Sequence, residues 1–145
     1  MVIIRLWHKD MISVLPREQL VAQWRECSAI AGNINTKGTP NHILVNKIMD
    51  YPMSHFISYA FHIRQEMTRR GYRTMDSVWN KILQTYESDY GEVEILPLDK
   101  LFPEWHNDTY WVICYYNLKE KWMCGGVRDE DWNKIDTQDS EWRLM

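Results

Sequence analysis

Apolar residues that repeat with the period of an α-helix are the feature that most constrains how this chain can fold. One repeat, with intervals of four, three and four residues, falls on Leu20, Trp24, Cys27 and Ala31. The same intervals recur at Trp111, Tyr115, Leu118 and Trp122. Residues at this spacing lie on one face of a helix, because one turn takes about 3.6 residues. The pattern predicts two amphipathic helices, each with one face in a core.

Proline and glycine set the expected ends of the first helix. Pro16 fits the first helical turn, and we expect the helix to run to about Ala31 and to stop at Gly32 and Asn33. Residues 33–41 then form a loop.

Three more helices are predicted between this loop and residue 91. Thr39 and Pro40 are typical of a helix start and predict a short helix to about residue 49. Asp50 lies near the cap of the next helix, whose apolar stripe is Ile57, Ala60, Ile63 and Met67. Gly71 ends that helix after a cationic last turn. Residues 74–91 predict a further helix, with Val78, Ile82 and Tyr86 in line.

The C-terminal third contains one clear helix between irregular segments. Residues 92–105 contain prolines and lack a helical period, so we expect a loop or a short strand. Asp108 is expected to cap the helix that carries the second repeat, and the Cys-Gly-Gly at 124–126 ends it. The cluster at 105–108 either caps this helix or lines a pocket, and we favour the cap. The acidic tail over about 128–145 is expected to form a helical turn followed by frayed chain. The prediction is an all-α fold, a single compact domain over residues 1–145 with four to five helices.

Aromatic residues are unusually frequent, with eight Trp and eight Tyr in 145 residues. This surplus has two explanations. One is a Trp-rich core with some exposed rings. The other is that some rings stack on bases or on another flat ligand.

The charge distribution bears on nucleic-acid binding. The net charge is −3, which argues against a dedicated nucleic-acid binder, because phosphate contacts usually require a basic surplus. However, basic residues gather in the first quarter of the chain and again over 64–73, whereas acidic residues concentrate from Glu87 onward. A basic face with acidic ends is compatible with this distribution.

Several classes of function are disfavoured. The cysteines Cys27, Cys114 and Cys124 have no paired spacing, which argues against structural zinc and fits a reduced, cytoplasmic compartment. No apolar run is long enough to span a bilayer, and no signal peptide is visible. No phosphate-binding Gly-rich loop is present, so an NTPase or a dinucleotide enzyme is disfavoured. We expect no cofactor, no metal, no membrane association and a monomer.

The Arg25-Glu26 pair is the strongest candidate for chemistry in the sequence. Glu26 lies about 100° around the helix from Cys27, at the border of the apolar stripe. Salt-bridging glutamates are common at such a border. The alternative is a carboxylate held at the edge of a pocket, and periodicity alone favours the salt-bridging explanation.

Three segments carry a family resemblance. They are PREQLVAQWRECSAIAG, NHILVNKIMDYPMSHFISYAFHIRQEMTRRGY and the shorter YYNLKEKW. They cover about the first half of the chain and the helix expected over 108–122. These segments resemble the pyrimidine-dimer DNA glycosylases of the phage endonuclease V type, and the chain looks like a bacterial and phage branch of that family. The strongest element is in the first predicted helix, where a leucine is followed four residues later by an aromatic residue, an arginine and a glutamate. These residues are Leu20, Trp24, Arg25 and Glu26.

The resemblance implies a mechanism. Members of this family are single helical domains that bend duplex DNA and attack C1′ of the damaged nucleotide with the α-amine at their own N-terminus. Such an amine titrates near pH 8, so a useful fraction is neutral and nucleophilic at physiological pH. Attack releases the base and leaves an imine to the opened sugar, and β-elimination then nicks the strand. A glutamate stabilises the positive charge and moves protons.

Carried onto this sequence, the resemblance assigns catalysis to Glu26 and to an N-terminal amine, which belongs to Val2 if Met1 is removed. The implied phosphate contacts are Arg5, His8, Arg25 and Lys121.

The chain departs from the family pattern at several positions. Asn117 falls where an arginine is expected, and Gln19 replaces a histidine. The nucleophilic threonine of the family falls on Arg5, so this chain begins four residues earlier. Lys9 is the alternative Schiff-base lysine.

Two main hypotheses follow. The first is a repair glycosylase and abasic-site lyase that acts on damaged double-stranded DNA. The second is a non-catalytic nucleic-acid-binding or interaction domain that kept the fold. A third, an unrelated helical scaffold, requires only the Trp-rich core.

Overall fold

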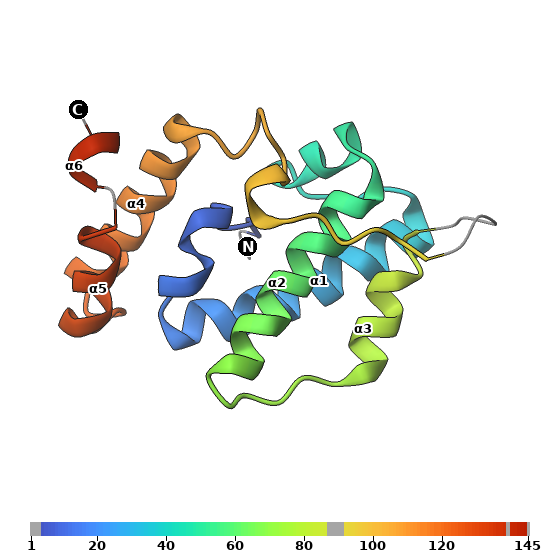
Figure 1. The fold of residues 1–145 in the computed structure, drawn as a ribbon, viewed down its shortest axis with the longest axis horizontal. Coiled ribbons are helices and arrows are strands. Elements are labelled where there is room, and N and C mark those ends of the chain that lie inside the picture. The colour runs from blue at the N-terminus through green and yellow to red at the C-terminus, as the bar shows by residue number, and fades with distance from the viewer. Residues whose placement is uncertain (1–3, 87–91, 139, 145) are drawn as a thin grey trace.

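The computed structural model describes residues 4–86, 92–138 and 140–144, and every regular element in these ranges is a helix (Figure 1). The elements are η1 (Lys9–Val14), α1 (Arg17–Lys37), η2 (Asn46–Asp50), α2 (Met53–Arg69), α3 (Asp76–Leu83), η3 (Leu98–Lys100), α4 (Asp108–Met123), α5 (Asp129–Asp136) and α6 (Ser140–Arg143), where η denotes a 3₁₀-helix. The predicted all-α fold is confirmed. None of these helices combines the length and the apolar composition that crossing a membrane requires.

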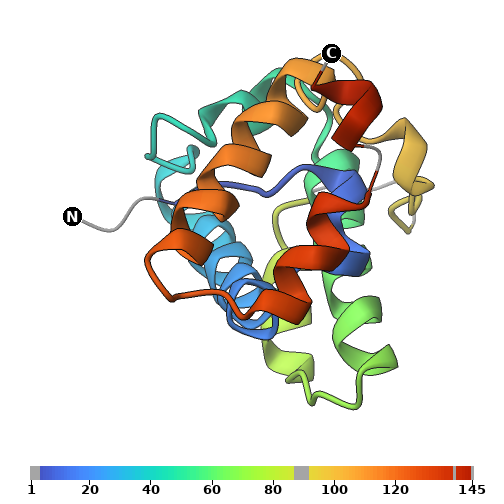
Figure 2. The same cartoon turned by 90° about the vertical axis from the view of Figure 1, so that its left-hand side faces the viewer.

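The N-terminal segment lies between two groups of helices. α1, α2 and α3 pack against one another, and α4 packs against α5 and α6. Residues 4–8 and η1 run between these groups, as Figure 1 and Figure 2 show. Leu6 and Met11 are fully buried there, and Trp7 is 6% exposed. The segment that carries Arg5 is therefore part of the core.

α1 buries the predicted stripe but extends beyond its predicted end. Gly32 does not stop the helix. A Cβ atom at this position would lie 3.0 Å from the end of the Lys81 side chain, so glycine leaves room for this side chain of α3. The helix ends instead at Gly38, which has a φ of 74° and donates its N–H to the Ile34 carbonyl.

The short helix expected from Thr39 to about residue 49 is wrong for most of its length. Asn41 has a left-handed φ of 61°, which interrupts any helix started at Pro40. A turn over 43–45 follows, and only η2 is helical. Val45 and Ile48 anchor this segment because both are fully buried.

α2 confirms the predicted apolar stripe, whereas α3 is shorter than expected. All four stripe residues of α2 are buried, and Gly71, with a φ of 84°, follows its last turn. Asp50 does not cap α2, which begins after Pro52 without a side-chain cap. α3 ends at Leu83, and the last part of the predicted helix, 87–91, lies outside the described residues.

The expected cap of α4 is displaced by one residue. Residues 92–97 form an irregular connection, as predicted, and η3 follows. The Asn107 side chain, rather than that of Asp108, accepts a hydrogen bond from the Tyr110 N–H at 2.9 Å. Asn107 is the better cap because its extended backbone precedes the first helical residue.

The predicted frayed tail is wrong for the residues that the structure describes. α5 buries Trp132 and Ile135, and the Trp132 ring stacks on Trp122 with centroids 5.3 Å apart. Arg143 pairs with Asp10 of η1. Apolar burial and this ion pair hold the tail against the rest of the chain.

Most of the tryptophans belong to the core. Five are less than 10% exposed: Trp7, Trp24, Trp105, Trp111 and Trp132. The most exposed aromatic residues among those described are Tyr116 (52%) and Trp142 (66%). Core packing therefore accounts for most of the aromatic surplus.

Candidate active site

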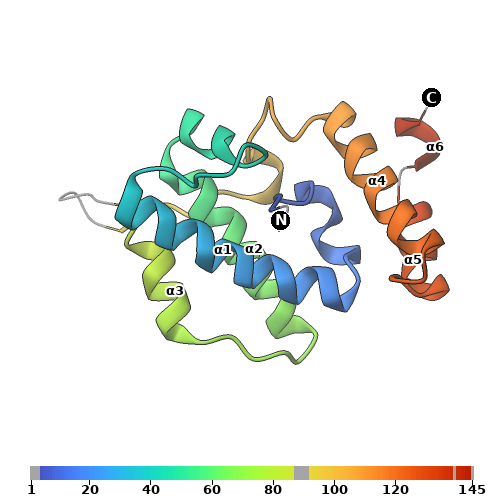
Figure 3. The same cartoon turned by 180° about the vertical axis from the view of Figure 1, so that it is seen from behind.

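A cleft of about 500 Å³ lies between the N-terminal segment, α1 and α4. Figure 3 shows these three elements on the side that faces the viewer. The residues that line the cleft are Arg5, Trp7, Glu18, Gln19, Ala22, Arg25, Glu26, Asn117, Glu120 and Lys121. Four residues proposed from the sequence, Arg5, Arg25, Glu26 and Lys121, meet in this cleft.

The buried stripe of α1 explains why Glu26 faces the cleft. Leu20 and Cys27 are fully buried, and Trp24 is 6% exposed. Their burial fixes the rotation of α1 about its axis. Arg25 and Glu26 are thereby turned away from the core, and both line the cleft.

A buried glutamine joins Glu26 to the N-terminal segment. Gln23 Nε2 donates to the Glu26 carboxylate at 3.0 Å and to the Arg5 carbonyl at 2.8 Å. Gln23 Oε1 accepts the Trp7 N–H at 2.7 Å, and the Tyr59 hydroxyl lies 2.9 Å away. The two walls of the cleft are therefore held together by one side chain that is fully buried.

Glu26 titrates in an unusual range. Burial raises the pKa of its carboxyl group from 4.5 to about 7, because the carboxylate loses hydration. Arg25, Arg5 and Lys121, together with the hydrogen bond from Gln23, act in the opposite direction and favour the charged form. Near neutral pH the group therefore exists in both states and can accept or donate a proton.

The cleft also contains three cations that surround the carboxyl group. The Arg5 guanidinium lies over the Trp7 ring, 5.3 Å from its centroid, so a buried ring supports this side chain. Arg25 is exposed on α1, and Lys121 is exposed on α4. Glu18 and Glu120 also line the cleft and reduce its positive charge. The arrangement suits an anionic ligand whose reacting atom lies near Glu26.

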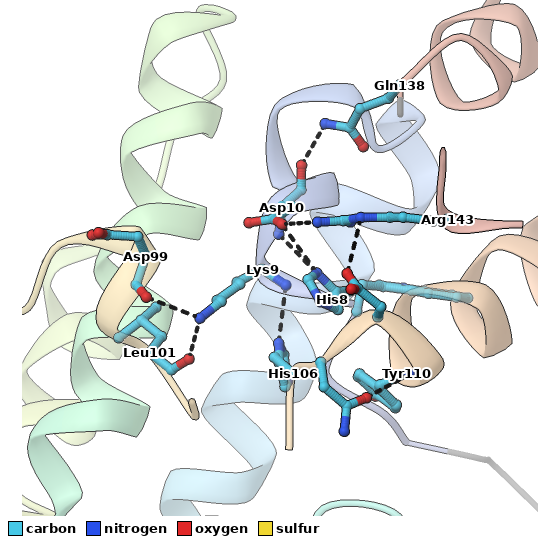
Figure 4. Close-up of polar contacts among 12 residues, drawn as sticks. His8, Lys9, Asp10, Asp99, Leu101, His106, Tyr110, Gln138 and Arg143 are labelled. Atoms are coloured by element: carbon cyan, nitrogen blue, oxygen red, sulfur yellow. Dashed lines mark hydrogen bonds and ion pairs between the residues drawn. The ribbon is translucent and has the colours of Figure 1, made fainter. Parts of the chain in front are cut away.

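His8 and Lys9, which the sequence suggested as DNA contact and alternative nucleophile, do not line this cleft. Figure 4 shows the polar contacts that they make instead. His8 is 1% exposed, and burial lowers its pKa to about 4. The Lys9 ammonium donates to the carbonyls of Leu101 at 2.6 Å and Asp99 at 3.3 Å. His8 cannot reach a phosphate from this position. Lys9 is committed to holding the η3 segment, so neither residue is retained as a site residue.

The remaining predicted positions fall into two groups. Val2 lies outside the described residues. Gln19 and Asn117, the two departures from the family pattern, both line the cleft. Sequence reasoning missed Gln23, although its position three residues before Glu26 places both side chains on adjacent turns of one helix.

The described residues contain no group of three His, Cys, Asp or Glu side chains arranged to hold a metal ion. Cys27 and Cys114 are buried, Cys124 is exposed, and none of these three forms a disulfide.

The fold and the cleft define a helical protein with a half-buried carboxylic acid in a cleft that also holds three cationic side chains. The model of the family described as pyrimidine dimer DNA glycosylase matches residues 4–80, just over half of the chain. The chain belongs to this family. Neither the comparison with curated proteins nor the comparison with solved structures found a match. The matched range includes Arg5, Arg25 and Glu26, whereas the α4 wall lies beyond it.

Proposed function

We propose that the protein is a DNA glycosylase and abasic-site lyase that acts on double-stranded DNA containing pyrimidine dimers or abasic sites. The observation that carries the proposal is the position of Glu26, whose carboxyl group titrates near pH 7 inside a cleft that also holds Arg5, Arg25 and Lys121. The family membership of residues 4–80 supports the same substrate class.

The reaction starts with an amine that attacks C1′ of the damaged nucleotide. The C1′–N glycosidic bond breaks, and the base leaves with the bonding electrons and takes up the proton that the attacking amine loses. Glu26, in its acid form, gives a proton to the sugar ring oxygen as the ring opens to an imine. As a carboxylate it then takes a proton from C2′, and the 3′ phosphate leaves in a β-elimination. A group with a pKa near the working pH can perform both transfers.

The proposed nucleophile is the α-amine of the chain, which belongs to Val2 once Met1 is removed. Covalent geometry keeps this amine within about 11 Å of Arg5, because three extended residues span no more than this distance. Arg5 lines the cleft, and its carbonyl is held by Gln23. An amine on this tether can reach the cleft from its N-terminal side.

Arg5, Arg25 and Lys121 are the proposed phosphate contacts. They come from three different elements around the carboxyl group, so a bent DNA backbone can contact all three. We also propose that the single domain acts as a monomer.

Borohydride trapping tests the proposal directly. The protein is incubated with duplex DNA that carries an abasic site or a cyclobutane dimer, reduced, and analysed by mass spectrometry. We expect a covalent adduct at the N-terminal residue, and Glu26→Gln should abolish strand cleavage while the protein stays folded. No adduct from a folded protein with its native start confirmed would reject the lyase mechanism.

A second candidate function is non-catalytic binding to DNA. The observation in its favour is Asn117, which lines the cleft where the family resemblance leads us to expect an arginine. This function predicts salt-sensitive binding to duplex or abasic DNA without imine formation. The same trapping reaction, combined with a binding assay at low salt, separates the two functions.

A further inference from the structure

The Gln23 side chain uses both of its N–H donors on two parts of the proposed site. A primary amide has two N–H donors and one carbonyl oxygen with two lone pairs. Both donors are used by the Arg5 carbonyl and the Glu26 carboxylate, and the oxygen contacts the Trp7 N–H and the Tyr59 hydroxyl. These partners also fix which way the amide is oriented, because the Trp7 N–H can only donate and the Arg5 carbonyl can only accept.

Core packing does not explain an amide at this position. Gln23 is fully buried, and burying an amide is unfavourable unless its hydrogen bonds are satisfied. The neighbouring stripe positions Leu20, Trp24 and Cys27 are filled by apolar or weakly polar side chains. The partners of Gln23 belong to segments that must keep a fixed spacing for an amine and a carboxyl group to act on one sugar.

We propose that Gln23 is a positioning residue that holds the N-terminal segment against Glu26 and reserves one carboxylate oxygen for the substrate. The hydrogen bond from Gln23 uses Glu26 Oε2, and among the described residues Oε1 accepts no hydrogen bond. Oε1 is therefore the atom that exchanges protons with the sugar. This inference rests on the proposed function for its catalytic meaning, whereas the contact between Gln23 and Glu26 can be tested without DNA.

The groups that face Glu26 come from all the elements around it. Arg25 lies on α1, Arg5 on the N-terminal segment and Lys121 on α4, and all three favour the carboxylate. Glu18 and Glu120 line the same cleft, and the nearby Cys27 and Tyr59 are neutral at physiological pH because burial raises the pKa of both. Gln23 does not titrate, and it acts on Glu26 through a directional hydrogen bond.

NMR titration of the wild-type protein gives the first test. The side-chain amide resonances of Gln23 should move with pH, with the same midpoint as the carboxyl carbon of Glu26. In Glu26→Gln the amide resonances should no longer move in this range. Gln23 resonances that do not respond while Glu26 titrates would overturn the inference.

Gln23→Glu tests the same contact by substitution. The new carboxylate keeps the acceptor for Trp7 but replaces the donor to Glu26, so the titration midpoint of Glu26 should rise by about one pH unit or more. Tyr59→Phe is the matched control, because it removes a neighbour of the same amide oxygen and leaves the contact with Glu26 in place. The control should lower the melting temperature and leave the midpoint unchanged. Equal midpoints in wild type and a folded Gln23→Glu variant would contradict the proposal.

The trapping assay distinguishes a failure of this inference from a failure of the proposed function. If wild type forms the trapped adduct, Gln23→Glu should form it about 100-fold more slowly, because small misplacements of reacting groups are costly. An unchanged rate in that variant would overturn the positioning role. If wild type forms no adduct but the Gln23 amide titrates with Glu26, the lyase function fails and the structural contact stands.

Discussion

The guanidinium of Arg143 donates a hydrogen bond to the carboxylate of Asp10 at 2.6 Å and so joins two residues that are 133 positions apart (Figure 4). The Arg143 side chain is 10% exposed, lies 3.3 Å from Asp108 and covers the Trp111 ring at 5.1 Å. Asp10 belongs to η1, which directly follows the N-terminal segment of the cleft. α6 is thus bound to η1, and η1 continues directly from the segment that forms one wall of the cleft.

Arg143→Ala should lower the free energy of unfolding by about 2 kcal/mol, because it leaves two carboxylates without their partner in a partly buried setting. Arg128→Ala is the control. Arg128 also pairs with two carboxylates, but its side chain is 74% exposed, so its loss should change the free energy of unfolding much less than the loss of Arg143. Urea unfolding at pH 7 measures both values, and equal losses would show that the Arg143 contact adds no stability.

Glu26→Gln should abolish strand cleavage and stabilise the protein. The folded pKa of Glu26 is raised to about 7 from 4.5, so its contribution to stability is present below pH 4.5 and is lost as the pH rises through 7. The neutral variant avoids that loss. We expect a gain of about 1–2 kcal/mol at pH 8, reduced by solvent screening, and no gain at pH 4. Thermal unfolding at both pH values, measured beside cleavage, is the test.

Lys121→Ala should weaken DNA binding and reduce its salt dependence. Removing one phosphate contact lowers the slope of log affinity against log salt by about one. Lys119→Ala is a matched control on the same helix, because Lys119 lies over the Tyr116 ring and does not line the cleft. Fluorescence anisotropy over a range of salt concentrations distinguishes the two variants. The same slope for both would exclude Lys121 as a phosphate contact.

Asn117→Arg should strengthen DNA binding. The variant adds a cation to the cleft at the position where the family resemblance leads us to expect one. We expect the affinity to rise about tenfold at low salt and the salt slope to increase by about one. Asn117→Gln, which extends the side chain without charge, is the control. A tighter complex with both variants would mean that size rather than charge is responsible.

The two buried histidines should contribute stability that is lost on acidification below pH 6.5, opposite in sign to the contribution of Glu26. Burial lowers the folded pKa of His8 from 6.5 to about 4, and it lowers that of His106 as well. A depressed histidine pKa means that protonation favours the unfolded chain, so stability present above pH 6.5 is lost as the pH falls. His8 alone should account for about 2 kcal/mol between pH 7 and pH 5. His8→Asn, which can keep the cap on η1, should lose less over this interval in chemical denaturation.

The sequence was sufficient for the fold class and for part of the site. Helical periodicity identified the buried faces of α1, α2 and α4, because apolar burial repeats every 3.6 residues whatever the partner is. The resemblance then selected Arg5, Arg25, Glu26 and Lys121, which the structure places in one cleft.

Tertiary packing decided the features that local patterns could not predict. Gly32 leaves room for a side chain of α3 in place of a helix stop, the tail is held by Trp132 and Arg143, and His8 and Lys9 point into the core. The role of Gln23 also depends on neighbours distant in sequence, Trp7 and Tyr59. The sequence by itself determined which faces of the helices are apolar and where Glu26 lies relative to them. Only the tertiary structure decided which groups surround Glu26, because burial and charge at a site are set by segments that local periodicity does not bring together.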